Sequence, residues 1–374
     1  MKLAFWCAAA VVFYAYVGYG AWLWMVSRVR PWPILRGQNL PFVSVVMVVR
    51  DEEHSLPAKL RNLAGLDYPR DGIEFVVVSD GSQDGTERIL SDAAKADGRF
   101  HVLSFADRKG KASRLNDALG AARGEIVLFC DARQEIESGA LRLLMENFSE
   151  PTVGCVSGEL MLGDAASGEA EEGMGIYWRV EKTIRELESA SGSVVGATGA
   201  LYAARRALLV PLPPDTILDD VFLPLHVARQ GARVVFDGRA RAWDNPDLGA
   251  GREFRRKVRT LTGNYQLLQI APWSLGGGNP LRFRFISHKL LRLLVPFALA
   301  VTLVASLAVP EPLYRLALVC QLFFYGLSLL ALTGAQLGPL ARVANAALTL
   351  IVLNTAAVVA FANFLTGRKE VWVR

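Results

Sequence analysis

The chain has 374 residues, of which 52% are hydrophobic, and its mean hydropathy is +0.27. It is longer than one ordinary domain and too apolar for a purely soluble protein, so part of it must lie in lipid. The net charge is +5, with Lys and Arg spread along the chain, which argues against a nucleic-acid partner. The cysteines lack zinc or disulfide spacing, and we interpret all four as small buried side chains in a reducing compartment: Cys7, Cys130, Cys155 and Cys320.

The first apolar run, 3–26, is long enough for the roughly 20 residues of a spanning helix, and Trp22 and Trp24 suit its interface with water. We interpret residues 1–30 as a signal anchor rather than a cleaved signal peptide, because the run is long and lacks a small-residue cleavage site. Only Lys2 precedes the run and three arginines follow it, so the positive-inside rule predicts that the next domain is cytoplasmic. The arginines are Arg28, Arg30 and Arg36.

A C-terminal region, 290–366, contains three further apolar stretches, over 290–309, 313–332 and 344–365. Basic residues in and just after the linker 276–289 fit a cytoplasmic start: Arg282, Arg284, His288, Lys289 and Arg292. Four spans in total would put the basic tail 367–374 outside, against the positive-inside rule, so we predict two to three C-terminal spans, with one late segment re-entrant or interfacial if only two cross. The prediction is a multi-pass protein of the cell (inner) membrane.

Between the membrane segments, residues 40–275 alternate apolar strands with amphipathic helices. Strands are expected over 42–49, 73–78 and 125–130, and helices over 56–63 and 86–94. This alternation predicts an α/β domain with a parallel sheet covered on both faces. Ligands of such sheets bind beyond the carboxyl ends of the strands.

Acidic residues follow all three predicted strands: Asp51, Glu52, Asp80, Asp84 and Asp131. A cluster of carboxylates is costly unless a cation or hydrogen-bond donors offset the repulsion, and a nucleotide with a divalent metal offers both. The alternative is that each acid caps the helix that follows it. We favour the cap for Asp84 and the functional role for Asp80 and Asp131.

Three ordered motifs carry a family resemblance. They are Val43-Ser44-Val45-Val46 through Asp51-Glu52-Glu53, Val78-Ser79-Asp80-Gly81-Ser82 with Asp84-Gly85-Thr86, and Phe129-Cys130-Asp131. Over about residues 40–265 the chain resembles the family 2 glycosyltransferases of GT-A fold. The resemblance implies a Rossmann-like nucleotide-diphospho-sugar transferase domain, a divalent cation (Mg²⁺ or Mn²⁺) at a DxD element, and one displacement that inverts the anomeric centre.

The resemblance also assigns residues to the donor side. Glu52 and Asp80 look like the contacts to the base and ribose, and Lys111 looks like the basic residue beside the diphosphate. Asp131 stands at the first carboxylate of the DxD element and is the implied metal ligand. Arg133 stands where a second acid is usual, so metal dependence does not follow from the motif alone.

Two readings of Arg133 follow from its chemistry. Its planar fork suits phosphate oxygens, so it would contact the diphosphate directly. Alternatively it points away and pairs with Glu135 or Glu137.

The segment Ile217-Leu218-Asp219-Asp220-Val221 resembles the base motif of the family, and by position Asp220 is the catalytic base. It would take the hydroxyl proton of the acceptor, a role in which a well-placed carboxylate contributes about 10² to 10⁴-fold. Asp219 would orient Asp220 or bind the acceptor. The alternative is that the two acids cap a helix over 221–229.

The acceptor side is assigned to a helix and a glycine-rich segment. Trp178, Glu181, Arg185 and Glu188 lie at helical spacing and precede Gly196-Ala197-Thr198-Gly199-Ala200-Leu201-Tyr202. A similar glycine-rich segment lies beside the acceptor in the family, which places Trp178 and Gly199 there. The alternatives are a charged, solvated helix face and a plain tight turn into a strand.

Processive members of the family carry a QxxRW element, and here Arg256, Arg259 and Thr260 stand at its Gln, Arg and Trp positions. We expect Arg259 to stabilise the leaving diphosphate and Arg256 to lie on the acceptor side. Alternatively, this basic run faces anionic lipid headgroups. Thr260 in place of Trp removes a stacking platform for a polymer, which favours transfer of a single sugar.

Taken together, these residues predict an inverting glycosyltransferase that moves a sugar from a nucleotide diphosphate donor to a membrane-associated or lipid-linked acceptor, in glycan or exopolysaccharide synthesis. Two alternatives stay open. One is a processive polysaccharide synthase. The other is a non-catalytic nucleotide-sugar-binding membrane protein, which Arg133 in the metal motif favours.

Overall fold

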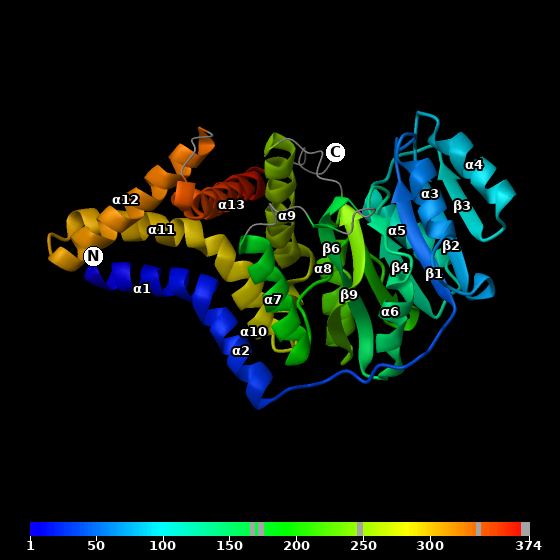
Figure 1. Ribbon diagram of the computed structural model, residues 1–374, viewed down its shortest axis with the longest axis horizontal. Coiled ribbons are helices and arrows are strands. Elements are labelled where there is room, and N and C mark those ends of the chain that lie inside the picture. The colour runs from blue at the N-terminus through cyan, green and yellow to red at the C-terminus, as the bar shows by residue number, and fades with distance from the viewer. Residues whose placement is uncertain (165–168, 171–175, 245–249, 334–337, 368–374) are drawn as a thin grey trace.

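The computed structural model describes residues 1–164, 169–170, 176–244, 250–333 and 338–367 (Figure 1). A layered α/β domain forms one end of the molecule and long apolar helices form the other, with the N-terminus among these helices. The predicted basic tail, with Arg368, Lys369 and Arg374, lies outside the described residues.

One half of the central sheet is parallel. Its strands are β1 (Val43–Val49), β2 (Ile73–Asp80), β3 (Phe100–Phe105) and β4 (Ile126–Cys130), in the order β3-β2-β1-β4. Each of these strands except β3 is buried along its length, as expected for a parallel sheet with helices on both faces. The predicted strands are therefore confirmed here.

The other half of the sheet is mixed, which corrects the prediction of a parallel sheet. It continues from β4 through β8 (Leu201–Arg205), β6 (Val153–Asp164), β9 (Arg233–Asp244) and β5 (Glu135–Ile136), while β7 (Glu169–Ala170) pairs with β6. β8 runs antiparallel to both of its neighbours, and β6 and β9 run parallel. Strands and helices continue to alternate after β4, but β8 is inserted antiparallel between β4 and β6.

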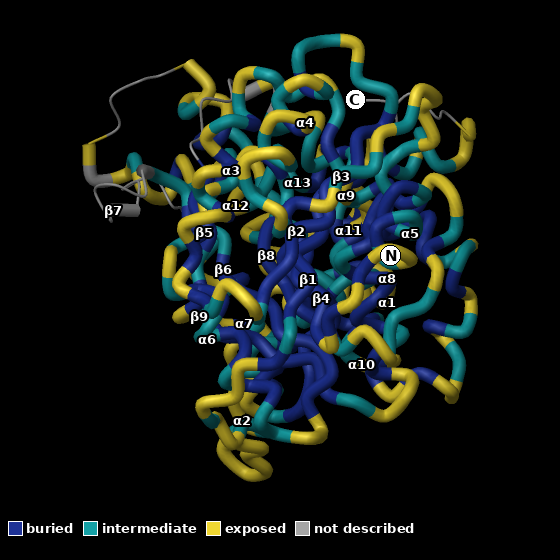
Figure 2. The backbone as a smooth tube through the Cα atoms, turned by 90° about the vertical axis from the view of Figure 1, so that its right-hand side faces the viewer, coloured by how far each residue is buried: buried dark blue, intermediate teal, exposed yellow. Residues whose placement is uncertain are grey.

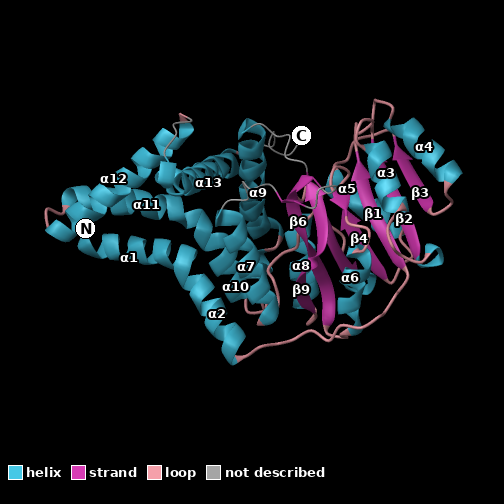
Figure 3. Ribbon diagram, in the orientation of Figure 1, coloured by secondary structure: helices cyan, strands magenta, loops and turns pink. Residues whose placement is uncertain are grey.

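Helices cover both faces of the sheet (Figure 3). They are α3 (Leu56–Ala64), α4 (Thr86–Ala96), α5 (Lys111–Ala121), α6 (Ala140–Glu146) and α8 (Asp219–Arg229). Successive residues of β1 face opposite cores: Val45 and Met47 pack with α3 and α6, whereas Val46 packs with α5 and α8. The centre of the sheet is consequently the most deeply buried part of the domain (Figure 2).

Four helices in the described part of the chain are long and apolar enough to cross a membrane. The first comprises α1 (Lys2–Phe13), a π-helical turn η1 (Tyr14–Gly18) and α2 (Tyr19–Val29). The second comprises α10 (Arg282–Phe285), a π-helical turn η6 (Ile286–Leu290) and α11 (Leu291–Ala308), and the others are α12 (Pro312–Leu332) and α13 (Ala341–Thr366). Large apolar side chains on their outer faces are exposed, among them Leu3, Val304 and Phe323, as suits contact with lipid.

Cys7 and Cys320 lie on these helices and are exposed, so the prediction that all four cysteines are buried is wrong for them. Cys130 and Cys155 are buried in the sheet, as predicted. A side chain that faces lipid has apolar surroundings, as a side chain in a protein core has. Composition alone therefore does not distinguish a buried cysteine from a lipid-facing one.

Two more helices lie between the membrane helices and the sheet (Figure 1): α7 (Ile176–Ala190) and α9 (Ala250–Ile270). The remaining short helices are η2 (Arg70–Gly72), η3 (Asn147–Ser149), η4 (Arg206–Leu208), η5 (Pro272–Leu275) and η7 (Gly338–Leu340).

Gly124→Ala is expected to destabilise the domain, because a Cβ atom at this position would lie 2.4 Å from the backbone nitrogen of Ser44 on β1. Overpacking of this kind costs about 1–3 kcal/mol. The matched control is Gly120→Ala in α5, where a Cβ atom would meet nothing within 4 Å. Thermal unfolding in detergent should show a lower midpoint for the first variant alone, and equal midpoints would contradict the prediction.

Candidate active site

The first residue of α5, Lys111, gathers carboxylates from two separate elements. Its Nζ lies 2.9 Å from Oδ1 of Asp131, which follows β4, and 3.5 Å from Oδ1 of Asp219, which begins α8. Asp220 lies within the electrostatic range of the same ammonium group. Four of the predicted site residues therefore meet beyond the end of β4.

The carboxyl groups of this cluster influence each other strongly. Burial and the neighbouring charge of Asp219 raise the pKa of Asp220 to about 6, although Lys111 opposes the shift. Burial disfavours a charged Lys111, but Asp131, Asp219 and Asp220 raise its pKa above the ordinary range. The ammonium group of Lys111 is thus held charged. The pKa of Asp220 is brought close to neutral pH, where a carboxylate exchanges protons readily.

Asp219 is almost fully buried behind Asp220. Its Oδ2 accepts a hydrogen bond of 3.4 Å from the Tyr202 hydroxyl, and the Tyr202 ring stacks on Phe129 with centroids 4.4 Å apart. The N-cap of α8 is Leu218, so neither aspartate makes the side-chain cap that was the alternative interpretation. Both acids lie in the first helical turn, where the helix dipole favours negative charge.

The glycine-rich segment lies directly against Asp220. The backbone N–H of Ala197 donates to the carbonyl oxygen of Asp220 at 2.7 Å. A Cβ atom on Gly199 would lie 3.1 Å from Oδ2 of Asp220, tighter than most real contacts. Gly199 therefore allows the carboxylate to approach the backbone closely.

Asp80 is buried, and its carboxylate accepts hydrogen bonds from the loop before α5 and from α5 itself. Oδ1 accepts from the backbone N–H of Lys109 at 2.7 Å and from Nε of Arg114 at 2.9 Å, and Oδ2 accepts from the N–H of Gly110 at 2.9 Å. These bonds fix the loop immediately before Lys111. The structure thus gives Asp80 a positioning role for Lys111 in addition to its predicted place near a ligand.

Arg114 was not identified from the sequence. Its guanidinium is fully buried, pairs with Asp80, Asp107 and Asp117 at 2.9 Å, and lies 3.8 Å from the centroid of the Phe105 ring. Arginine on an amphipathic helix is usually exposed, so no residue pattern marks this one. It anchors α5 and with it Lys111.

The predicted residues after β1 occupy the rim of the site. Oε1 of Glu52 accepts from Nε of Arg133 at 3.2 Å. Arg133 therefore does not pair with Glu135 or Glu137, which corrects one of the two readings, and its side chain remains 65% exposed. Asp84 was predicted to cap the following helix, but the N-cap of α4 is Gly85; Asp84 accepts instead from the backbone N–H groups of Thr86 at 3.0 Å and Glu53 at 3.1 Å.

Helix α9, which contains Arg259, packs against the segment that precedes Asp219. Arg259, Gly263 and Gln266 lie on one face of the helix by their spacing. Gly263 packs against Leu218, and Oε1 of Gln266 accepts from the N–H of Ile217 at 3.0 Å. Arg259 stands one turn before Gly263 along α9.

Trp178 and Arg256 form a second group farther along α7 and α9. The Trp178 ring lies 5.5 Å from Nζ of Lys257 and lines a cavity of about 170 Å³ together with Phe236, Glu181 and Arg185. Arg256 lies 2.9 Å from Glu253 and 3.5 Å from Asp244 at the end of β9. None of the described contacts of Trp178 or Arg256 is with Lys111.

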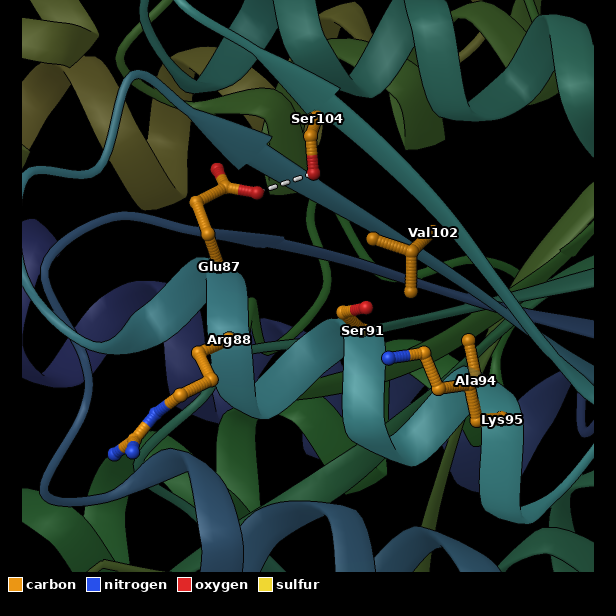
Figure 4. Close-up of a pocket in the computed structure, with 7 residues that line it drawn as sticks. All are labelled: Glu87, Arg88, Ser91, Ala94, Lys95, Val102 and Ser104. Carbon is orange, nitrogen blue, oxygen red and sulfur yellow. Dashed lines mark hydrogen bonds between the residues drawn. The ribbon is translucent and has the colours of Figure 1, made fainter.

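A hollow of about 630 Å³ lies elsewhere, between α4 and the edge strand β3 (Figure 4). Glu87 contacts Ser104 across it, and Arg88 and Lys95 are among its lining residues. None of its seven lining residues belongs to the predicted site, so it is separate from the carboxylates at β4 and α8.

Within the described residues, no three side chains of His, Cys, Asp or Glu come together as a complete metal site. Asp131 offers one carboxylate, and Lys111 already lies beside it. Mg²⁺ is commonly held by one or two carboxylates together with substrate phosphates and water. These residues therefore fit a divalent cation only when a phosphate ligand supplies further oxygens.

Part of the chain matches a family of known proteins. Residues 44–210 match the family model described as glycosyl transferase family 2. The beta-monoglucosyldiacylglycerol synthase of Trichormus variabilis is 28% identical over 205 residues, which are 53% of this chain and 44% of that protein. The poly-beta-1,6-N-acetyl-D-glucosamine synthase of Staphylococcus epidermidis is 23% identical over 243 residues, 63% of this chain and 58% of that protein. The chain thus spans about half the length of these curated relatives.

Among solved structures, the mannosyltransferase PcManGT from Pyrobaculum calidifontis, in complex with GDP-Man and Mn²⁺, matches with a TM-score of 0.76 and 23% identity. The match covers 98% of this chain and 99% of that one, so the shared fold includes the membrane helices as well as the sheet.

Substitutions around Asp220 should move its pKa in opposite directions. Asp219→Asn removes a neighbouring negative charge and should lower the pKa of Asp220 below about 6, whereas Lys111→Met removes an opposing positive charge and should raise it. NMR of ¹³C-labelled aspartate carboxyls in detergent would measure both shifts, with Asp220→Asn to assign the signal. The exposed Asp67→Asn serves as the control, and shifts of the same sign in both variants would contradict the arrangement.

Proposed function

We propose that this chain, whose residues 44–210 match the family model described as glycosyl transferase family 2, is an inverting glycosyltransferase that moves a sugar from a nucleotide diphosphate donor to an acceptor at the membrane. The single observation that carries the proposal is the half-buried Asp220, which lies beside Asp219 and Lys111 and whose pKa is raised to about 6. A general base works best when its pKa lies near the working pH.

In the proposed reaction, Asp220 accepts the hydroxyl proton of the acceptor. The acceptor oxygen forms a bond to C1 of the sugar as the bond from C1 to the diphosphate oxygen breaks, with inversion at C1. The bonding electrons leave with the nucleoside diphosphate. Lys111 and Arg259 supply fixed positive charge toward the leaving group, where preorganised charge lowers the barrier.

On the donor side, we propose that Glu52 and the exposed Arg133 hold the base and the diphosphate at the rim, while Asp80 holds the loop beneath them. A divalent cation, Mg²⁺ or Mn²⁺, would be held by Asp131 together with the donor phosphates and would neutralise charge on the diphosphate. This keeps the DxD assignment with one acid instead of two.

On the acceptor side, we propose a lipid-linked or other membrane-associated acceptor that reaches Asp220 past Gly199, with Asp219 behind the base and Trp178 and Arg256 farther out. Four helices that could enter a membrane adjoin the domain, and one relative is named for a diacylglycerol product. We further propose a multi-pass inner-membrane protein with a cytoplasmic catalytic domain at 40–275, between an anchor at 1–30 and a C-terminal region at 290–366.

A second candidate is a processive polysaccharide synthase, since another relative is named for a polymer. Thr260 at the Trp position of the QxxRW element argues against it. Product length distinguishes the two functions, because a single transfer adds one sugar whereas a processive synthase makes polymers of many lengths.

Asp220→Asn should reduce turnover by roughly 10² to 10⁴-fold, because the amide cannot accept the acceptor proton. Donor binding should persist, since Lys111 and Asp131 remain. The matched control is Asp215→Asn, an exposed loop position with φ of 61° that Asn also tolerates. Diphosphate release from a donor panel would measure the effect. Wild-type protein that releases none with any donor would favour the non-catalytic, nucleotide-sugar-binding reading.

Chelation of divalent cations should abolish diphosphate release, and Mg²⁺ or Mn²⁺ should restore it. Asp131→Asn should raise the metal concentration needed for half-maximal release, because the site offers one carboxylate at this position. Glu135→Gln, on the short strand β5, is the control. Equal release with and without chelator would refute Asp131 as an essential metal ligand.

A further inference from the structure

The face of α7 that contains Glu181, Arg185 and Glu188 is not solvated. Glu188 is completely buried and Glu181 is 9% exposed. The interpretation of these residues as a charged, water-facing helix surface is therefore wrong for the two glutamates. Their partners come from the membrane helices.

His288, in η6 at the start of the second candidate span, lies between the two glutamates. Its Nε2 is 2.9 Å from Oε1 of Glu181 and its Nδ1 is 3.0 Å from Oε1 of Glu188. One imidazole ring thereby joins two points of α7 that are two turns apart.

Two further residues, one from the same candidate span as His288 and one from the first span, also contact the glutamates. Nη1 of Arg292 in α11 donates to Glu181 at 2.7 Å, and the hydroxyl of Tyr19 in α2 donates to Glu188 at 2.5 Å. Burial alone would raise the pKa of each carboxyl group, but Arg292 and His288 lower the pKa of Glu181, and His288 and Tyr19 lower that of Glu188. We call Glu181, Glu188, His288 and Tyr19 the junction cluster.

The junction cluster is linked to the segment that contacts Asp220. The N–H of Val195 donates to Oε2 of Glu188 at 3.4 Å, and Nη1 of Arg185, one turn from Glu181, donates to Oγ1 of Thr198 at 2.6 Å. Val195 and Thr198 flank Ala197, which donates to the carbonyl oxygen of Asp220.

Arg284 of α10 adds a second link. Its guanidinium donates to the carbonyl oxygens of Glu188, Ser191 and Ser193, at 2.5–2.8 Å. The backbone from the end of α7 to Val195 is therefore tied to the helix that leads into the membrane.

We propose that the junction cluster is a positioning device, through which the membrane helices hold the 195–199 segment, and with it the Asp220 carboxylate, in the geometry needed for proton transfer. The catalytic part of this inference rests on the proposed function, whereas the mechanical part does not. No member of the cluster contacts Asp220 itself among the described contacts, so these are positioning residues rather than catalytic ones.

The test uses the full-length protein in detergent or lipid nanodiscs with His288→Gln and Glu188→Gln. Hydrogen exchange should accelerate at the amides of residues 195–198, while those of β1 and β4 stay protected. The turnover number should fall about 10- to 100-fold, the range expected for a displaced reacting group, with the KM for the donor little changed. A variant that merely weakened the whole fold would accelerate exchange in β1 and β4 as well.

The matched control is His101→Gln, a histidine that also lies beside a carboxylate and an arginine, Glu74 and Arg123, but on the edge strand β3. It should change neither readout. If the cluster variants fail to fold, Tyr19→Phe removes one hydroxyl donor and should produce a weaker effect of the same kind.

Unchanged exchange at 195–198 in the folded variants would overturn the proposal. The exchange measurement needs no substrate, so it also decides the matter if the wild-type protein transfers no sugar. In that case the proposed function is wrong, and the exchange measurement alone tests the positioning device.

Discussion

The geometry of the candidate active site depends on one ammonium group. Asp131 comes from the end of a strand and Asp219 and Asp220 from the start of a helix far along the chain, and carboxylates this close together repel each other. Lys111 offsets the repulsion from the first position of α5. Its own place is fixed from below by Asp80 and the buried Arg114, which hold the preceding loop and the helix.

The interactions on the side of the domain that faces the long apolar helices differ from those in its core. The sheet is held by apolar packing on two faces, whereas α7 meets the long apolar helices through buried, paired charges as well as through apolar side chains. Buried ion pairs contribute little net stability, but they are strongly destabilising when one partner is lost, so they define a single arrangement. A junction of this kind suits a domain that must keep one orientation toward the bilayer.

Much of the proposed donor side could be placed from the sequence, because it consists of local motifs at the ends of β1, β2 and β4. Adjacent parallel strands end at the same edge, so acids in these motifs must converge. The prediction of side-chain contacts was less complete where the two partners lie far apart in the sequence. The three donors to Asp80 come from a loop and helix about 30 residues later, and nothing periodic marks Arg114.

The same limit explains the second half of the fold. The antiparallel pairing of β8 with β4, and the bonds from His288 to residues about 100 positions earlier, depend on tertiary packing alone. From the sequence, His288 could be recognised only as one of several basic residues flanking a span. Its role as a link between two glutamates on α7 became visible only when both helices were in place.

The π-helical turn in the first span has a geometric consequence. A π turn holds an extra residue, which rotates the helix that follows by about 100° relative to a regular one. Before the turn, Phe5 packs against Tyr314 of another membrane helix, and after it Tyr19 and Leu23 pack with Ile184 of α7. The axis also bends between α1 and α2 (Figure 1). One continuous helix can thus serve as a joint, with one end phased to the bilayer and the other to the enzyme domain.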